Sequence, residues 1–419
     1  MTLKDIMTRY RVWRSARLQE KVLRRIRRRK PGTKIRVVFY VSDTAKWKCQ
    51  SLYKKLERSP DFEPLVIVGL YSFDQKHKTS EEIEQDLCSK ERFFANLGCR
   101  TERAVSGTDY SPTPLRRFDP DVIFLQQPWG IPHAYRPFRC SAVALPFYMP
   151  YYVQVGYQFE SRWINSFHPY LHTYFMLSQQ LADRFKVDKR PRQSRCRFVP
   201  TGHTALDLFA AAMNDPSNGE CVIYAPHFSF PHPDHALGIG TFMWNGREIL
   251  EYAQRHREFN WVFKPHPTLR RDLVQFGGWT KEETDAYYAA WEHLGEAYYG
   301  GGYQEIFLRS FAMITDCDSF LAEYGATGKP VIRLISAGCA YDSQRELMDY
   351  VKTYYSAQSL EEMFSVFRLV LEERQDPQRE VRRQAVVQAG LTGVCAADKV
   401  VAYMRDLFNE SQKTEDARI

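Results

Sequence analysis

The stretches Trp261–Pro267, WVFKPHP, and Met313–Ile332, MITDCDSFLAEYGATGKPVI, decide the fold of this chain. Each begins as a short apolar run of the strand type and ends in a polar turn. In a parallel α/β sheet such turns lie at the carboxyl edge, where open α/β sheets bind their ligands. We therefore predict that both stretches deliver polar residues to one ligand site at a sheet edge.

The first stretch places a cation and an imidazole in its turn. Lys264 and His266 flank Pro265, and Pro267 follows, so the turn is stiff and both side chains project from it. Two donors beside the end of a strand suit a phosphate group.

The second stretch supplies the complementary half of a pyrophosphate site. Thr315, Asp316, Asp318 and Ser319 fall where strand gives way to helix. This position offers capping side chains, backbone amides and the positive end of a helix dipole. Asp316 and Asp318 could also be claimed as a metal-binding pair, but beside a helix start they favour capping, so the pattern leaves a Mg²⁺ requirement open without implying one.

Strand-like and helix-like segments alternate on both sides of these stretches. The strands are predicted at 35–41, 64–68, 121–126, 142–149, 196–199, 220–225, 260–264, 312–315 and 330–334, and the helices at 51–56, 81–97, 359–374 and 379–407. This alternation predicts two Rossmann-like α/β domains facing a central cleft, the GT-B arrangement. The predicted divisions are 1–33, 34–195, 196–375 and 376–419, the last being a helix and a tail.

The N-terminal segment is strongly basic and amphipathic. Residues 1–36 hold 14 Lys and Arg against two acids, a net charge of +12, so the remaining 383 residues carry −4 of the whole-chain +8. Apolar residues fall at helical spacing in two stripes, Leu3, Ile6, Met7, Tyr10 and Trp13, then Leu18, Val22 and Ile26. We predict a helix that lies on an anionic membrane surface through residues 1–30, in preference to a solvated or RNA-binding arm.

Composition excludes several other classes of protein. A chain of 419 residues, 44% of them hydrophobic, can fill two cores. Nine cysteines without regular spacing favour neither a disulfide framework nor a zinc site, and therefore indicate a reducing cytoplasm. No apolar run is long enough to predict a transmembrane helix. The negative balance outside residues 1–36 argues against a nucleic-acid-coating protein.

Several of these motifs together resemble the CDP-glycerol glycerophosphotransferase family, whose members polymerise teichoic acids and capsules. The motifs are KPHP, TDCDSFLAEY followed by TGKPVI, YAPH at Tyr224–His227, GTFMWN at Gly240–Asn245, VFYVSDTAKWKCQSLYKKL at Val38–Leu56 and PTGHTALD at Pro200–Asp207. The resemblance covers residues 35–375. It implies the same two-domain fold and a CDP-linked alcohol as donor.

In the reaction that this resemblance implies, an acceptor hydroxyl attacks the phosphorus nearer the alcohol and CMP leaves. Lys264 and His266 would stabilise the phosphoryl charge from one side, and Ser319 with the helix-start amides from the other. Thr315 and Asp316 would shape that loop. Glu323, one turn further along the helix, is either a ligand for a ribose or glycerol hydroxyl or an exposed helical carboxylate.

The general base has more than one candidate. His227 in YAPHFSF lies at another strand end and could accept a proton near neutral pH, or be only a turn residue. The family places a His-Gly motif in its acceptor domain, whereas the matching region here, PFYMPYYVQVG at 146–156, contains no histidine. The base is therefore His227, or His133 in WGIPHAY, or another group while Tyr151 and Tyr152 bind the acceptor.

The sequence thus predicts an enzyme that transfers an alditol phosphate from a CDP-alditol to a hydroxyl of a bacterial surface polymer or its primer. We expect it on the inner face of the cytoplasmic membrane. A GT-B glycosyltransferase that uses a nucleotide sugar is the second interpretation, because both classes bind pyrophosphate at helix starts. A non-catalytic nucleotide-binding scaffold of an assembly complex is the third.

Overall fold

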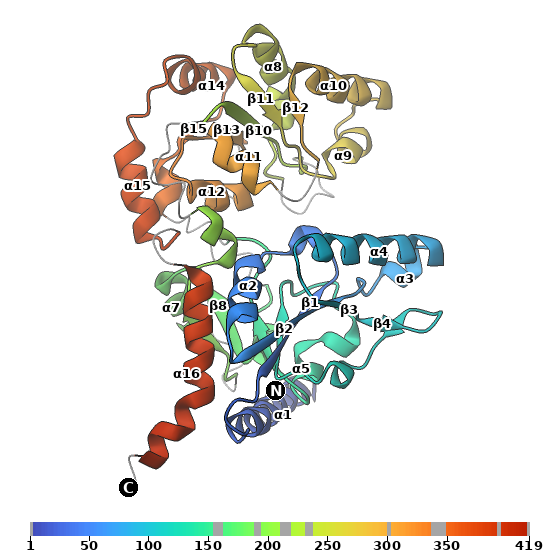
Figure 1. The fold of residues 1–419 in the computed structure, drawn as a ribbon. Helices are drawn as coiled ribbons and strands as arrows, with labels where there is room; N and C mark the ends of the chain where they lie inside the picture. The colour runs from blue at the N-terminus through green and yellow to red at the C-terminus, as the bar shows by residue number, and fades with distance from the viewer. Residues whose placement is uncertain are drawn as a thin grey trace. The chain divides into compact units, whose positions relative to one another are not determined.

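The computed structural model describes residues 3–153, 162–187, 194–209, 219–230, 238–299, 303–336, 349–391 and 395–416. The chain forms two compact α/β units, each coloured by its place in the sequence in Figure 1. Of the described residues, those up to Asp207 and those from Cys395 belong to the first unit, and those from Leu208 to Leu391 belong to the second.

The first unit is built on a seven-stranded parallel sheet. The strand order is β3 (Thr101–Arg103), β2 (Phe62–Val68), β1 (Ile35–Val41), β6 (Val122–Leu125), β7 (Leu145–Tyr148), β8 (Thr173–Met176) and β9 (Arg197–Pro200). The chain starts in the middle at β1 and moves outward first to one side and then to the other, as in Rossmann-like sheets. A small hairpin of β4 (Val105–Ser106) and β5 (Ser111–Pro112) stands beside it.

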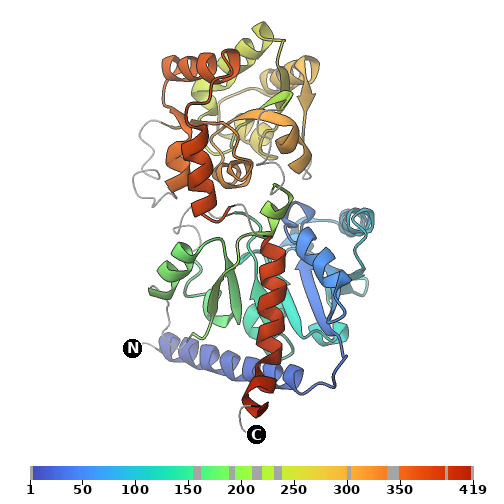
Figure 2. The same ribbon diagram turned by 60° about the vertical axis from the view of Figure 1, so that its left-hand side comes forward.

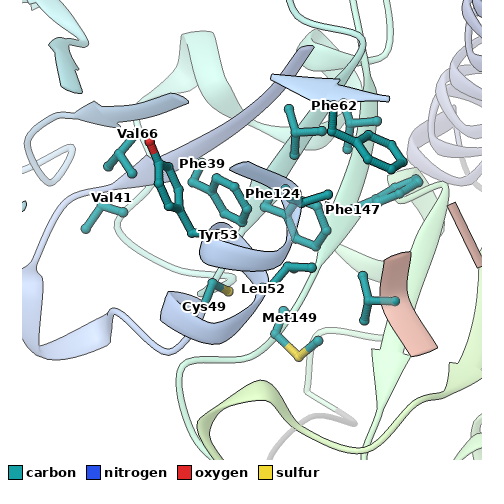
Figure 3. Close-up of a cluster of buried hydrophobic side chains, with 14 of the residues drawn as sticks. Phe39, Val41, Cys49, Leu52, Tyr53, Phe62, Val66, Phe124, Phe147 and Met149 are labelled. Carbon is teal, nitrogen blue, oxygen red and sulfur yellow. The ribbon is translucent and has the colours of Figure 1, made fainter. Parts of the chain in front are cut away.

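Aromatic and β-branched side chains fill the core under this sheet (Figure 3). Phe39 on β1 stacks on Phe124 on β6 at 4.9 Å between ring centroids, and Phe124 stacks on Phe175 of β8 at 5.8 Å. Leu52 and Tyr53 of α2 (Gln50–Arg58) pack into the same cluster. The strands are apolar on both faces because helices cover both, which is why their sequences read as continuous hydrophobic runs.

The helices and short turns of the first unit occupy the connections between these strands. Besides α2 they are α3 (Asp74–His77), α4 (Ser80–Asn96), α5 (Pro137–Cys140) and α7 (Gln179–Val187), with 3₁₀ turns at Thr44–Lys46, Leu115–Phe118, His133–Tyr135, His168–Tyr170 and Thr204–Phe209. Helix α4 begins with a capping box, in which Thr79 and Glu82 bond each other's backbone N–H groups.

The second unit repeats the plan with six parallel strands. Their order is β12 (Glu296–Ala297), β11 (Asn260–Phe263), β10 (Cys221–Ala225), β13 (Ser310–Thr315), β14 (Val331–Leu334) and β15 (Tyr355–Ala357). The helices are α8 (Phe242–Arg255), α9 (Leu269–Gln275), α10 (Lys281–Leu294), α11 (Gln304–Arg309), α12 (Asp318–Gly325), α14 (Leu360–Phe367), which continues as a π-helical turn to Glu372, and α15 (Arg379–Gln388). Trp261, Phe263 and Trp291 form the centre of its core.

The prediction of one long helix at 379–407 is wrong, because the chain forms two helices there. Helix α15 ends at Gln388, and Gly390 follows with a φ of +72°, a left-handed conformation that glycine adopts without strain. Helix α16 (Ala396–Asp416) belongs to the first unit, where Asp207 accepts hydrogen bonds from the N–H groups of Ala396 and Ala397 at 2.6 and 3.1 Å. Asp207, at the end of the PTGHTALD motif, is therefore a helix cap.

The N-terminal helix α1 (Leu3–Arg27) is an integral part of the first unit rather than a detached arm. Its stripe of Val12, Ala16, Val22, Leu23 and Ile26 is buried, so the second apolar stripe of the sequence faces protein, not lipid. Figure 2 shows α1 running along one end of the unit and crossing α16, where the Arg27 side chain donates to the Leu407 carbonyl. The side chain of Leu3 lies outside the described part.

The opposite stripe of α1 is exposed. Ile6, Met7, Tyr10 and Trp13 retain 47%, 49%, 56% and 47% of their accessible surface. Large apolar side chains grouped on one helix face in this way mark an interaction surface. Among the described residues, no helix is both long and apolar enough to cross a bilayer.

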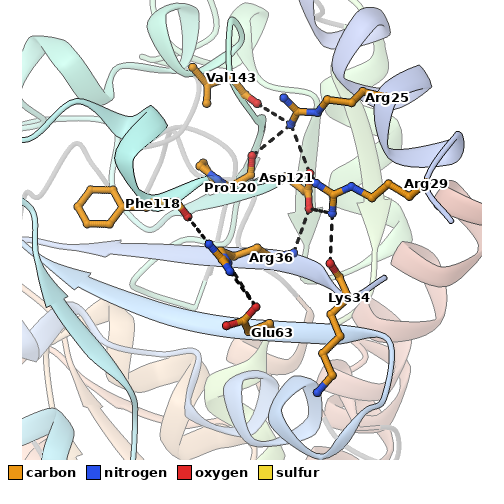
Figure 4. Close-up of polar contacts among 9 residues, drawn as sticks. All are labelled: Arg25, Arg29, Lys34, Arg36, Glu63, Phe118, Pro120, Asp121 and Val143. Carbon is orange, nitrogen blue, oxygen red and sulfur yellow. Dashed lines mark hydrogen bonds and ion pairs between the residues drawn. The ribbon is translucent and has the colours of Figure 1, made fainter. Parts of the chain in front are cut away.

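A buried carboxylate fixes the C-terminal half of α1 (Figure 4). Asp121, at the start of β6, is fully buried and pairs with both Arg25 and Arg29. It also accepts a hydrogen bond from the backbone N–H of Arg36, at the start of β1, at 3.0 Å. Arg25 further donates to the carbonyl of Val143 at 3.0 Å, so α1 is tied to three segments of the sheet at once.

We predict that Asp121→Ala lowers the free energy of unfolding of the first unit by about 3 kcal/mol, because it leaves two guanidinium groups without their buried partner. Urea-induced unfolding would measure this change. The control is Asp398→Ala, which removes the exposed pair with Lys55 and should cost less than about 1 kcal/mol. Equal losses in the two variants would contradict the anchoring role of Asp121.

Candidate functional site

The second unit gathers the candidate donor-site residues at one edge of its sheet. Strands β10 and β13 are neighbours, and the chain leaves them toward opposite sides, which makes their carboxyl ends a topological switch point. His227 follows β10, Lys264 and His266 follow β11, and Thr315 ends β13. The expectation that WVFKPHP and MITDCDSF meet at one sheet edge therefore agrees with the topology.

Asp316 ties the loops of this edge together. Its carboxylate accepts the backbone N–H of His227 at 2.6 Å through one oxygen, and the N–H and hydroxyl of Thr241 at 2.6 and 2.8 Å through the other. The residue is only 6% exposed, and burial raises the pKa of its carboxyl group against the opposing effect of these hydrogen bonds. Asp316 thus positions the start of α8 and the loop after β10 instead of pointing at a ligand.

Thr315 has a similar positioning role. Its hydroxyl donates to the carbonyl of Ala225 at 2.7 Å and accepts the N–H of Cys317 at 3.0 Å, which joins the ends of β13 and β10. At the next residues α12 begins, and no side chain at Cys317 caps its first turn. Asp318 and Ser319 stand partly exposed in that turn, beside amides that suit an anion.

The imidazole rings of His227 and His266 lie close together, and each accepts a backbone N–H at its Nδ1 atom. Their ring centroids are 5.5 Å apart. The N–H of Ser229 donates to Nδ1 of His227 at 3.2 Å, and the N–H of Thr268 donates to Nδ1 of His266 at 3.3 Å. Because Nδ1 accepts in both rings, the neutral tautomer carries its proton on Nε2, so each ring presents a donor there.

Lys264 and Glu323 are both buried beside this edge. The Lys264 ammonium lies 5.6 to 5.9 Å from the ring centroids of Tyr298, Tyr303 and Phe320. Glu323 is 1% exposed and accepts the Tyr303 hydroxyl at 2.6 Å, so the interpretation of Glu323 as an exposed helical carboxylate is wrong. An ammonium next to a helix N-terminus favours the binding of a phosphate.

The acceptor-side candidates lie in the first unit. Tyr151 and Tyr152 follow β7 and are partly exposed. Their ring centroids are 5.1 Å apart. His133 is exposed in the loop after β6, with its ring 5.5 Å from that of Phe138. Partial desolvation and the charges of Arg139 and Arg136 lower the pKa of His133, which favours its neutral form.

The sequence analysis missed Lys46, which lies in the first unit at the carboxyl edge of its sheet. Its ammonium lies 4.3 Å from the ring centroid of Tyr151 and 5.4 Å from that of Trp129. Burial lowers its pKa and Lys48 acts in the same direction, while Asp43 opposes them. The signal was present in the sequence, because Lys46 follows the strand Ile35–Val41 at the switch point between β1 and β6.

The part of the chain that the structure describes contains no cluster of three His, Cys, Asp or Glu side chains that could hold a metal ion. Of the proposed pair of aspartates, Asp316 already uses both oxygens for hydrogen bonds within the protein. Asp316 and Asp318 therefore do not form a ready metal site in this conformation.

Comparisons with solved structures give the fold class. The chain matches the wall teichoic acid polymerase TagF over 99% of both chains at 12% identity and a TM-score of 0.55. It also matches MnaA from S. aureus, solved with UDP, over 90% of this chain and 97% of that one, at 14% identity and a TM-score of 0.51. The UDP-GlcNAc 2-epimerase of Methanocaldococcus jannaschii matches over 89% and 99%, at 12% identity and a TM-score of 0.51.

At these identities the likeness establishes the fold alone, a GT-B-like protein of two Rossmann-like α/β units with an additional N-terminal helix. No protein-family model and no curated protein sequence matches the chain.

We predict that Asp316→Asn lowers the stability of the second unit by about 2 kcal/mol, because an amide has one acceptor oxygen for three donors. Urea-induced unfolding would measure this change. Asp349→Asn, at an exposed position of the same unit, is the control. Unchanged stability would contradict the positioning role given to Asp316.

Proposed function

We propose that this protein transfers an alditol phosphate, such as glycerol phosphate, from a CDP-alditol to a hydroxyl group of a bacterial surface polymer or its primer. The observation that carries the proposal is the edge after β10, β11 and β13, where two imidazole donors, a buried ammonium and the start of α12 lie together. The likeness to TagF, a wall teichoic acid polymerase of which one structure was soaked with CDPG, supports the choice of donor.

In the proposed reaction the acceptor oxygen attacks the phosphorus that carries the alditol. The bond from that phosphorus to the oxygen bridging to CMP breaks, and CMP leaves with the electron pair. Lys264, the Nε2–H groups of His227 and His266, and Ser319 with the α12 amides neutralise the phosphoryl oxygens, whose charge is spread in the transition state. Glu323 and Tyr303 stand beside this group and would orient a ribose or alditol hydroxyl.

The acceptor proton needs a base, and the hydrogen bonds of the histidines bear on its choice. His227 accepts at Nδ1, so its neutral ring donates at Nε2 and is better suited to bind phosphate than to take a proton. The first unit offers His133, whose pKa is lowered, as the base, with Lys46, Tyr151 and Tyr152 holding the acceptor. We therefore propose His133, and not His227, as the general base.

A second candidate function is transfer of a sugar from a nucleotide sugar. It is favoured by the likeness to UDP-GlcNAc 2-epimerases and to MnaA solved with UDP. The same edge would then bind a UDP pyrophosphate. The two functions differ in the bond that breaks, because glycosyl transfer releases the nucleoside diphosphate or monophosphate from carbon.

We predict that the purified protein releases CMP from CDP-glycerol or CDP-ribitol in the presence of a membrane or polymer acceptor, and that His266→Ala lowers this rate by about 100-fold or more through loss of a transition-state donor. The control is His293→Ala, an exposed histidine of α10 in the same unit. Release from UDP-sugars alone would favour the second function. Silence with every donor would indicate a non-catalytic nucleotide-binding scaffold.

We further propose that the protein is peripheral on the inner face of the cytoplasmic membrane and that the exposed face of α1 makes the contact. Ile6, Met7, Tyr10 and Trp13 would enter the lipid interface. Exposed basic residues follow along the same helix, at 14, 17, 21 and 24, and each contributes about 1 kcal/mol near an anionic surface.

We predict that Tyr10→Ser combined with Trp13→Ser weakens sedimentation with anionic vesicles by about tenfold or more, because two amphipathic rings leave the interface. Point variants are needed because deletion of residues 1–30 would also remove the buried stripe of α1. Val187→Ser, at a residue 80% exposed elsewhere in the first unit, is the control. Unchanged sedimentation of the double variant would contradict the membrane assignment.

A further inference from the structure

A small niche lies at the carboxyl edge of the first unit's sheet, between β1 and β6. These two strands are neighbours, with β2 and β3 beyond one and β7, β8 and β9 beyond the other, so the niche marks a topological switch point. Its volume is about 10 Å³, which is room for one water molecule or for one oxygen atom of a larger group. In its lining Ser42 and Lys46 follow β1, Gln126 and Gln127 follow β6, and no carboxylate is present.

Gln126 brings an unsatisfied hydrogen-bond donor to this niche. The residue is 3% exposed, and its Oε1 accepts the backbone N–H of Lys48 at 2.9 Å, which fixes the orientation of the amide. In the part of the chain that the structure describes, the Nε2 group of Gln126 is buried without an acceptor. Because a buried N–H group without a partner is unfavourable, this amide indicates a ligand oxygen that the described residues do not supply.

Lys46 brings a positive charge to the same niche. Its ammonium lies 4.3 Å from the ring centroid of Tyr151 and 5.4 Å from that of Trp129, and cation–π contacts of this kind hold the charge in place. Among the described residues no carboxylate forms an ion pair with Lys46. The charge at the niche is therefore positioned but not neutralised by a direct partner.

The carboxylate of Asp43 acts on Lys46 without pairing with it. Its Oδ1 accepts the N–H of Ala45 at 2.9 Å, and its Oδ2 accepts the Tyr71 hydroxyl at 2.9 Å. Burial lowers the pKa of Lys46, the charge of Asp43 opposes this effect, and the charge of Lys48 adds to it. An anion beside Lys46 would stabilise its charged form against both burial and Lys48.

The donors of the niche define the chemical class of its ligand. The Tyr40 hydroxyl already donates to the carbonyl of Leu70 at 2.6 Å, and Nε2 of Gln127 donates to the carbonyl of Trp129 at 2.8 Å. The remaining ammonium and amide N–H would repel a metal ion. A water molecule would satisfy the amide but leave the ammonium without a counter-charge.

One oxygen of an anionic group satisfies both donors at once. A hydrogen bond between a charged donor and a charged acceptor is about twice as strong as a neutral one, and a single ammonium binds phosphate as a point charge. The niche has room for one oxygen, so the rest of a phosphate group stays outside it. The partly exposed rings of Trp129 and Tyr151 stand at that place.

We propose that this niche is a phosphate-binding site of the first unit, in which Lys46 and the Nε2 group of Gln126 hold one oxygen of the phosphate. Trp129 and Tyr151 contact the part of the ligand that carries this group. The site belongs to the sheet of the first unit and is built from other residues than the donor edge of the second unit. It therefore goes beyond the proposed function, and its occupation needs no nucleotide.

Competitive acetylation of the full chain with acetic anhydride, followed by peptide mass spectrometry, measures the site at Lys46 itself. A ligand that covers the ammonium slows the labelling of Lys46, and the dependence on ligand concentration gives an apparent Kd. We expect saturating inorganic phosphate to slow this labelling by about tenfold or more relative to potassium chloride at equal ionic strength. Lys399, an exposed lysine of α16, is the internal control and should label equally in both salts.

Substitutions of Gln126 test the second donor. Gln126→Met keeps the length of the side chain and removes the Nε2–H group, so the apparent Kd for phosphate should rise by about tenfold. Gln126→Glu keeps an acceptor for the N–H of Lys48 and adds a negative charge, so it should abolish the protection of Lys46 by phosphate.

The matched control is Gln75→Met, at an exposed glutamine of α3 in the same unit, and it should keep the wild-type Kd. Lys90 is 4% exposed and reports on folding. Slow labelling of Lys90 in each variant shows that the first unit is folded, so a change at Lys46 is then a change at the site.

Three results would overturn the proposal. They are equal labelling of Lys46 in phosphate and in chloride, a wild-type Kd in both Gln126 variants, and protection by acetate as strong as that by phosphate. Glycerol 3-phosphate and a soluble glycerol phosphodiester form two further arms that identify the source of the phosphate. Tighter binding of an ester assigns the site to a phosphate within a larger molecule, and tighter binding of the free ion assigns it to inorganic phosphate. Because no donor is present, this result is independent of the test of CMP release.

Discussion

A sheet whose strands all run in one direction brings every strand's carboxyl end to the same edge, and both units are built on such a sheet. This constraint collects residues far apart in the sequence, such as His227, His266 and Thr315. It also creates a cost, because the loops that meet there must satisfy their backbone groups close to the core. The buried carboxylate of Asp316 satisfies three donors of these loops. It accepts hydrogen bonds from the backbone N–H groups of His227 and Thr241 and from the Thr241 hydroxyl. The edge is therefore held in shape before any ligand arrives, which favours tight and oriented binding.

Buried charges also fix the orientation of α1 on the first unit. A helix with apolar stripes on both sides could pack against the rest of the unit through either stripe. Asp121, by pairing with Arg25 and Arg29 near the C-terminal end of α1, fixes the rotation of the helix about its axis. Val22 and Ile26 then enter the core of the first unit, and Tyr10 and Trp13 remain outside. The exposure of that face is thus a consequence of buried electrostatics elsewhere on the helix.

Local sequence predicted the parallel strands well, because buried strands are short continuous apolar runs bounded by turns. Ile35–Val41 and the strand ending at Thr315 are examples. Helix α10 was missed because its aromatic and charged residues hide the periodicity, although Thr280 and Glu283 form a readable capping box. The burial of Glu323 and the split between α15 and α16 depend on partners distant in sequence, Tyr303 and Asp207, which periodicity does not show.

The hydrogen bonds of the two histidines also bear on how the proposed chemistry is divided. When Nδ1 accepts a backbone N–H, the neutral ring donates at Nε2, and protonation adds charge without changing that role. Such rings stabilise phosphoryl oxygens at any protonation state but cannot accept a proton at Nε2 in the neutral form. Phosphoryl transfer needs both functions at one phosphorus atom. The proposed reaction also needs a proton acceptor, and burial together with the charges of Arg139 and Arg136 lowers the pKa of His133, which favours the neutral form of this candidate.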